Sequence, residues 1–206
     1  MKSFMSVCAA LLVFFASAPL AQAAANPYVG LSAGIALLQN SDIKAEGLTD
    51  EDAIEYATGY AVNGALGIDG GMYRIEGAVG YQANDIDVTP GGPVDDDEDV
   101  SLSILSFLAN GYIDIGMSGS VVEPYVMAGA GVATVTLSDE GVDEGSTAFA
   151  YQFGAGVGIQ ATPNVVLDLG YRYFATADVT YDEIPDGEMD VTVASHNIMA
   201  GVRVGF

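Results

Sequence analysis

The sequence has little of what reactive, metal-binding and nucleic-acid-binding proteins depend on. Its 206 residues include one cysteine, one histidine and no tryptophan. Cys8 lies in an apolar N-terminal segment that we expect to be removed, so we predict no disulfide and no thiolate-dependent metal or catalytic site in the rest of the chain. Five basic residues stand against 28 acidic ones, which gives a net charge of −23 and leaves no basic patch for nucleic acid. No Gly-rich phosphate-binding motif is present either, and we predict no cofactor.

Long apolar runs are absent beyond the N-terminus. Lys2 precedes an apolar stretch over residues 4–20, and Ala21-Gln22-Ala23 has the small-residue pattern of a cleavage site. We therefore predict a signal peptide over residues 1–23. The alternative is an uncleaved membrane anchor, which would be expected to carry a charged stop signal. Residues 24–206 contain no further run of about 18 apolar residues, so no membrane-spanning helix is predicted.

Apolar and polar residues instead alternate, a pattern typical of β-strands. In the last stretch of the chain the residues at 198, 200, 202, 204 and 206 are apolar, while Arg203 lies on the opposite face. Eleven tilted strand residues are about enough to cross a bilayer core. Eight such segments are predicted: 27–38, 57–69, 72–82, 101–115, 124–137, 147–161, 165–174 and 192–206.

The connections between these segments alternate in length and charge. Four long ones, 39–56, 83–100, 138–147 and 175–191, contain 23 of the 28 acidic residues. The intervening ones are short, and Gly70-Gly71 suits a tight hairpin that requires a positive φ. This arrangement predicts an eight-stranded antiparallel up-and-down transmembrane β-barrel, with four long acidic extracellular loops and both termini on the periplasmic side. A soluble barrel of the lipocalin type would place its apolar face inside, whereas here the charges and glycines share the other face.

Outward-facing aromatic residues fit the two membrane interfaces. Tyr73 and Tyr81 lie eight residues apart on one face, roughly 20 Å of height for a tilted strand. Phe206 is expected at the periplasmic rim. An outer girdle is predicted from Tyr60, Phe149, Tyr151, Tyr171 and Tyr173.

The strand phase places five charged side chains in the lumen: Arg74, Glu76, Asp168, Arg172 and Arg203. A charge there must be paired or hydrated. We expect Arg172 and Arg203 near Asp168, and Arg74 paired with Glu76 on its own strand. The favoured interpretation is a static ion network that props the barrel open, and the alternative is a gate in a narrow polar conduit. Inward glycines leave room for water or for long arginines.

The sequence gives little support for a catalytic site or a metal site. Ser195 and His196 are adjacent in a strand and so point to opposite faces, which excludes a direct nucleophile–base pair. We predict that the protein is not an enzyme. The run Asp95-Asp96-Asp97-Glu98-Asp99 could collect divalent cations but lacks the spacing of a calcium loop, so no dedicated metal site is predicted.

Several stretches resemble the eight-stranded outer-membrane β-barrel family of Gram-negative bacteria, the OmpA-like and opacity-type porin-family surface proteins. They are Pro27-Tyr28-Val29-Gly30-Leu31, PYVMAGAGV over residues 124–132, YQFGAGVGIQATPNVVLDLGYRYF over 151–174, and the ending GVRVGF. In the ending, Gly201, Val204 and Phe206 look like the signal by which such barrels are recognised for insertion.

The resemblance implies an outer-membrane location. It also implies contact with outer-membrane lipid and lipopolysaccharide and recognition by the barrel-assembly machinery. Divalent cations could bridge the acidic loops to lipopolysaccharide phosphates. We predict a small surface barrel with a structural or interaction-related role and a polar lumen filled by side chains. The alternative is a narrow, weakly cation-preferring pore for small solutes, and a lipid-modifying enzyme is a more remote one.

Overall fold

The computed structural model describes eleven stretches of the chain. They are residues 26–39, 41–45, 48–56, 58–89, 92–93, 101–116, 120–139, 142–177, 179–181, 189–191 and 193–206. The predicted signal peptide, residues 1–23, lies outside these stretches. Among the described residues there is no helix of the length and hydropathy needed to span a membrane.

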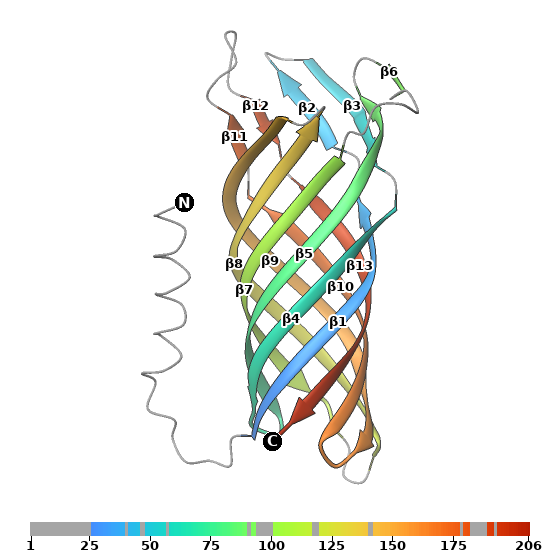
Figure 1. Ribbon diagram of the computed structural model, residues 1–206, viewed down its shortest axis with the longest axis vertical. Coiled ribbons are helices and arrows are strands. Elements are labelled where there is room, and N and C mark those ends of the chain that lie inside the picture. The colour runs from blue at the N-terminus through green and yellow to red at the C-terminus, as the bar shows by residue number, and fades with distance from the viewer. Residues whose placement is uncertain are drawn as a thin grey trace.

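Eight long strands close into an antiparallel barrel, which confirms the predicted fold (Figure 1). Each pairs with two neighbours, and the β5–β7 ladder closes the sheet, so no long strand is left with a free edge. The strands are β1 (Asn26–Leu38), β4 (Gly59–Asp69), β5 (Tyr73–Thr89), β7 (Ser101–Asp114), β8 (Val122–Asp139), β9 (Val142–Thr162), β10 (Val165–Thr176) and β13 (Ala194–Gly205).

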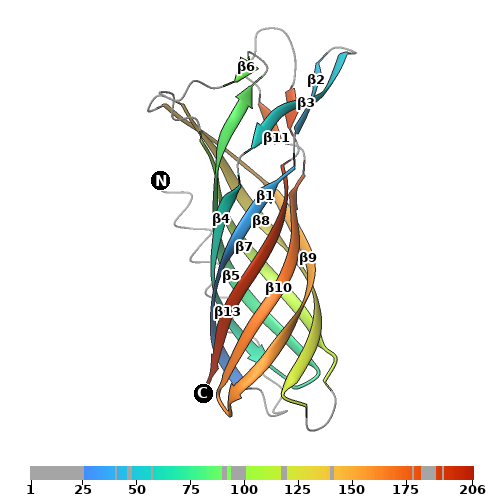
Figure 2. The same ribbon diagram turned by 90° about the vertical axis from the view of Figure 1, so that its right-hand side faces the viewer.

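Five short strands gather at one end of the barrel, which we call the loop end (Figures 1 and 2). β2 pairs with β3, β3 and β6 pair with β5, and β11 pairs with β12. The C-terminus and the start of β1 lie at the opposite end, the turn end (Figure 2). The short strands are β2 (Ser41–Ala45), β3 (Leu48–Tyr56), β6 (Gly92–Pro93), β11 (Val179–Tyr181) and β12 (Met189–Val191).

Three of the long strands extend further toward the loop end than the alternation predicts. β8 continues to Asp139 and β9 begins at Val142, so most of the expected loop 138–147 is a paired hairpin. β5 likewise continues to Thr89. Threonine and valine favour strands, and the hydroxyl groups of Thr134 and Thr147 meet across this hairpin at 2.9 Å. These strands therefore continue beyond the point where the apolar alternation stops. The end of the alternation marks the edge of the membrane-facing surface and does not mark the end of the strand.

The turn between β4 and β5 has the geometry that its glycines predict. Gly71 has a φ of 90°, and its N–H donates to the Asp69 carboxylate at 2.7 Å. A residue with a Cβ rarely adopts this φ. The turn end of the barrel is thus built from a short, locally hydrogen-bonded connection.

The outer surface of the barrel is apolar and the lumen contains the polar groups, as the strand phase predicts. β7 settles the one ambiguous segment, because Leu102, Ile104 and Leu108 point inward while Phe107 shares the outward phase of Ile113. Exposed apolar side chains on the outer face include Leu31, Ile35, Val62, Leu66, Ile75, Val79, Val126, Phe153, Leu167, Leu169 and Ile198.

Aromatic rings line the outer face toward the loop end, where the predicted girdle places them. The ring of Tyr60 lies 6.3 Å from that of Tyr81. On β9, β10 and β13 the rings contact one another in series: Phe153 stacks on Tyr173 at 5.0 Å, and Tyr173 meets the imidazole of His196 edge to face at 5.3 Å. Tyr73 and Phe206 are exposed at the turn end. The two ends of the apolar surface are therefore both marked by aromatic side chains.

Candidate functional site in the barrel lumen

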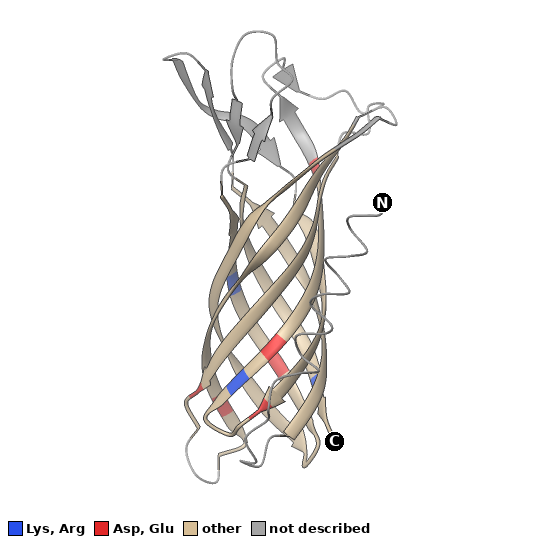
Figure 3. Ribbon diagram, turned by 90° about the vertical axis from the view of Figure 1, so that its left-hand side faces the viewer, with Lys and Arg blue, Asp and Glu red and all other residues tan. Residues whose placement is uncertain are grey.

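The charged residues that Figure 3 colours lie mostly in the half of the barrel nearer the turn end. The most buried of them is Arg74 on β5, whose Nε and Nη2 donate to the two carboxylate oxygens of Asp114 at 2.7 and 2.8 Å. The Arg74 guanidinium also lies 4.2 Å from the ring centre of Tyr112 and 5.0 Å from that of Tyr125. This bidentate pair is nearly inaccessible to solvent, with 2% and 7% of the two side chains exposed.

The partner of Arg74 is therefore Asp114 on β7, and not Glu76 as we expected from their spacing. Residues two apart on one strand project side by side, about 7 Å apart. Arg74 is directly opposite Tyr112 in the β5–β7 register, so Asp114 is a cross-strand diagonal neighbour that a long side chain can reach. Asp114 was missed because the register between strands cannot be read from either strand alone.

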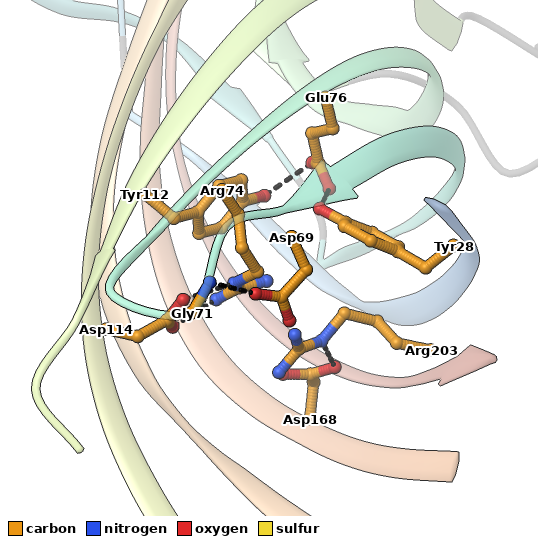
Figure 4. Close-up of polar contacts among 9 residues, drawn as sticks. All are labelled: Tyr28, Asp69, Gly71, Arg74, Glu76, Tyr112, Asp114, Asp168 and Arg203. Atoms are coloured by element: carbon orange, nitrogen blue, oxygen red, sulfur yellow. Dashed lines mark hydrogen bonds and ion pairs between the residues drawn. The ribbon is translucent and has the colours of Figure 1, made fainter. Parts of the chain in front are cut away.

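Glu76 is held by neutral donors from other strands (Figure 4). The hydroxyl of Tyr28 donates to it at 2.9 Å, the amide of Asn110 at 3.0 Å, and the hydroxyl of Tyr112 donates to the same oxygen as Asn110. Asn110 in turn accepts from Gln152 at 2.7 Å. Three donors thus meet the hydrogen-bonding capacity of one carboxylate. No guanidinium among the described residues forms an ion pair with Glu76.

Arg203 on β13 pairs with Asp168 on β10, as predicted. Its Nε and Nη2 donate to the carboxylate at 2.7 and 3.1 Å (Figure 4). The side chains are 11% and 16% exposed, so solvent reaches this pair more readily than it reaches Arg74 and Asp114.

Arg172 does not join Asp168. The two lie four residues apart on β10, roughly 13 Å along the strand, and Arg172 pairs in register with Asn197 instead. Within the described part of the chain, no hydrogen bond or ion pair engages the Arg172 guanidinium. It lines two small cavities of about 30 and 40 Å³. The structure therefore contains two direct ion pairs, Arg74–Asp114 and Arg203–Asp168, in place of the expected network of five charged residues. Glu76 and Arg172 belong to neither pair.

Toward the loop end the lumen changes from charged to neutral polar. Asn197 donates to Ser195 at 3.2 Å, Ser195 to Gln82 at 3.1 Å, and Gln82 to Asn84 at 3.1 Å. Asn84 ends the chain of hydrogen bonds at the carbonyl of Ala36, 2.9 Å away. These amide and hydroxyl groups were not among the candidate residues, although their inward phase is readable from the alternation.

Beside these polar groups, and at the same height, the lumen is apolar, because Ile104 pairs in register with Gln82 and Leu102 with Asn84. A cluster of buried side chains from five long strands, together with Val193 just before β13, packs there, and we call it the loop-end apolar layer. It consists of Leu38, Leu102, Ile104, Leu108, Ala133, Val135, Ala150, Phe174 and Val193. A layer of this composition excludes hydrated ions, because burying a charge without a partner is costly.

Inward glycines make room for tyrosine rings. A Cβ on Gly156 or Gly170 would press on the Tyr125 hydroxyl, and one on Gly67 would overlap the ring of Tyr28. The space that we expected for water or arginine is thus largely occupied by aromatic side chains.

Ser195 and His196 lie on opposite faces, as their adjacency predicts. Ser195 is fully buried in the lumen, whereas His196 lies on the outer face between Tyr171 and Gln39. The two imidazole nitrogens are 2.6 Å from the Tyr171 hydroxyl and 2.9 Å from the Gln39 amide. Among the described residues no three histidine, cysteine or carboxylate side chains cluster to hold a metal ion. The acidic run Asp95-Asp96-Asp97-Glu98-Asp99 lies outside the described residues.

The three residues of the candidate assembly signal occupy the end of β13. Val204 and Phe206 are exposed on the outer face, whereas Gly201 has the inward phase. The N–H of Phe206 donates to Pro27 at 3.1 Å, and Asn164 holds the Gly205 carbonyl at 3.1 Å. The terminal ring is therefore presented outward from a fixed backbone.

We predict that Phe206→Asp lowers the amount of protein in the outer membrane severalfold while leaving folding into detergent nearly intact. The substitution removes the terminal aromatic group and puts a charge at a lipid-facing rim. Membrane fractionation with immunoblotting measures the first quantity, and gel mobility with and without boiling the second. Phe206→Tyr is the matched control, since it keeps the ring. Normal membrane levels of Phe206→Asp would show that the ending plays no part in assembly.

The comparison with known proteins agrees with this architecture. Residues 6–206 match the outer membrane protein beta-barrel domain. The chain belongs to this family. The family and the relatives also give the location: this is an outer membrane protein.

Individual relatives are more distant. The chain is 29% identical to outer membrane protein PagN of Salmonella typhimurium over 133 residues, which are 56% of this chain and 55% of that protein. It is 31% identical over 107 residues to major surface antigen 4 of Anaplasma marginale, covering 48% of this chain and 36% of the antigen. The matches thus span about half or less of these relatives. Among solved structures, Neisserial surface protein A is similar with a TM-score of 0.58 and 25% identity, over 87% of this chain and 97% of that chain.

Proposed function

We propose that this barrel acts through its extracellular surface, in a structural or interaction-related role, and that its lumen does not conduct ions. The observation that carries the proposal is that side chains fill the lumen near the loop end. There the loop-end apolar layer lies level with the buried polar side chains of Gln82, Asn84 and Ser195. A pore needs a continuous hydrated path, and here the polar side chains are hydrogen-bonded to one another beside buried leucine, isoleucine and phenylalanine side chains. The two lumen cavities, of about 30 and 40 Å³, each have room for only a few water molecules.

The relatives support a role at the cell surface. Major surface antigen 4 and Neisserial surface protein A are surface proteins by name, and PagN is an outer membrane protein by name. The proposal assigns no catalytic role, and Ser195 and His196 cannot act as a nucleophile–base pair, because they lie on opposite sides of the barrel wall. The partners we propose are outer-membrane lipid, lipopolysaccharide and the barrel-assembly machinery. Divalent cations bridging the acidic loops to lipopolysaccharide phosphates are part of the same proposal.

Single-channel recording of the refolded protein in planar bilayers tests the proposal. We expect no ion conductance from the wild type. Shortening two side chains of the apolar layer, in Ile104→Ala with Phe174→Ala, removes bulk that fills the lumen beside the small cavity of about 30 Å³ and is expected to produce a measurable leak. The matched control, Leu105→Ala with Phe107→Ala, changes outward side chains of the same region and should remain silent. Reproducible channels in the wild type would replace the surface role with the pore alternative.

A further inference from the structure

Arg172 is the one lumen guanidinium without a described partner, and its surroundings contain a second unpaired group. Asn197 lies directly opposite it in the β10–β13 register. The Asn197 side chain is 7% exposed and donates to Ser195, but its Oδ1 atom has no hydrogen-bond partner. A strong donor and a buried acceptor therefore face the same space. Leaving either the Arg172 guanidinium or the Asn197 Oδ1 atom without a hydrogen-bond partner costs free energy.

The space between them is a cavity of about 30 Å³ whose lining is part polar and part apolar. Its polar lining side chains are Asn63, Gln82, Ser106, Gln152, Arg172 and Asn197. Arg172 also lines the second cavity, of about 40 Å³, together with Arg74, Glu76, Asp168 and Arg203. One water needs about 10–15 Å³, so each cavity has room for about two or three waters.

The charges around these cavities decide what kind of ligand fits. Arg74 is neutralised by Asp114 and Arg203 by Asp168, which leaves the Arg172 cation and the Glu76 anion. Their sum is zero, so an added anion or cation would introduce an uncompensated charge into the interior. The ligand must also accept from a guanidinium and donate to an amide oxygen. Water satisfies all of these conditions.

A path between the two charges is present. Arg172 lines the second cavity together with Tyr112 and Tyr125. The Tyr112 hydroxyl donates to Glu76, and Glu76 lines the second cavity with Arg172. We propose that water in the two cavities links the Arg172 guanidinium to Asn197 and to the Glu76 carboxylate, so that Arg172 and Glu76 form a third, water-bridged charge pair of the lumen. This inference goes beyond the proposed surface role and does not depend on it.

The first test detects the water in the wild type. Magnetisation transfer from water to the side-chain amide of Asn197 is measured by NMR on the protein folded in detergent micelles. We expect transfer to this amide. The side-chain amide of Asn84, which is engaged with the Ala36 carbonyl and lines neither cavity, is the internal comparison. Transfer to Asn197 no stronger than to Asn84 would overturn the proposal.

The second test measures the coupling between the two charges. The midpoint of reversible urea unfolding in lipid vesicles is compared for Arg172→Met, Glu76→Gln and the double variant. We expect Arg172→Met to shift the midpoint less when Glu76 is already glutamine, because no counter-charge remains to be lost. In the control cycle, Arg172→Met with Asp114→Asn, the shifts should add, since Asp114 is already paired with Arg74. Additive shifts in both cycles would show that Arg172 and Glu76 are not a pair.

Discussion

Arg74→Ala is expected to lower the free energy of unfolding by about 3–5 kcal/mol, the range found when one partner of a buried ion pair is removed. The substitution leaves the Asp114 carboxylate buried with no cation and also removes the contact of the guanidinium with the rings of Tyr112 and Tyr125. The measurement is equilibrium unfolding in urea of the protein folded into lipid vesicles.

The second ion pair provides the control for this expectation. Arg203→Ala should cost less than Arg74→Ala, because the Arg203 pair is 11% and 16% exposed and water can replace the lost partner. The double variant Arg74→Ala with Asp114→Ala should be more stable than the sum of the two single effects predicts. Equal losses for Arg74→Ala and Arg203→Ala would mean that the lumen is hydrated throughout.

Gly131→Val is expected to prevent the barrel from forming. A Cβ at this position would overlap the carbonyl oxygen of Phe107 on the neighbouring strand β7. The obstacle is backbone, which cannot turn aside as a side chain can. The cost should therefore exceed the roughly 1–3 kcal/mol typical of overpacking between side chains. The folded fraction is measured by the mobility difference between boiled and unboiled samples.

Gly111→Val is the matched control. Gly111 also lies in a paired strand, but a Cβ there has no neighbouring atom within 4 Å. This variant should fold to the same extent as the wild type. Folding of Gly131→Val at wild-type yield would show that β7 and β8 can separate enough to admit a side chain.

The membrane-spanning part of each strand could be predicted because every second residue there faces lipid and must be apolar. The segments predicted over 27–38 and 165–174 correspond to Asn26–Leu38 and Val165–Thr176. Beyond the membrane no apolar rule applies, which is why the paired continuation of β8 and β9 was expected to be loop. The same reasoning explains β7, where Leu102 and Ile104 face an apolar layer inside while Leu105 and Phe107 share the outward phase, so apolar residues occur on both faces.

The lumen residues were predictable individually but not as pairs. Strand phase alone placed Arg74, Glu76, Asp168, Arg172 and Arg203 inside. Partners depend on the register between strands and on side-chain reach, and neither is visible in one strand. Arg203 and Asp168 lie on neighbouring strands with no closer competitor, so proximity was sufficient for them. Arg74 has three carboxylates nearby: Glu76 on its own strand, Asp69 directly opposite on β4 and Asp114 on β7. Of these, Asp114 accepts both of its N–H groups, while Asp69 accepts from the Gly71 N–H.

The length of the β8–β9 hairpin gives one side of the protein a mechanical property of its own. The 21 residues of β9 extend roughly 70 Å, or roughly 50 Å of height at the usual tilt. The hydrocarbon band accounts for only about 25 Å of that height. The remainder is hydrogen-bonded sheet outside the hydrocarbon, with β8 paired to β9 as far as Asp139 and Val142. On this side the wall of the barrel continues beyond the hydrocarbon as a stiff, hydrogen-bonded β-hairpin. With the loop end outside the cell, as we propose, a large molecule approaching the cell would meet an ordered β-surface raised above the lipid before it reached the membrane itself.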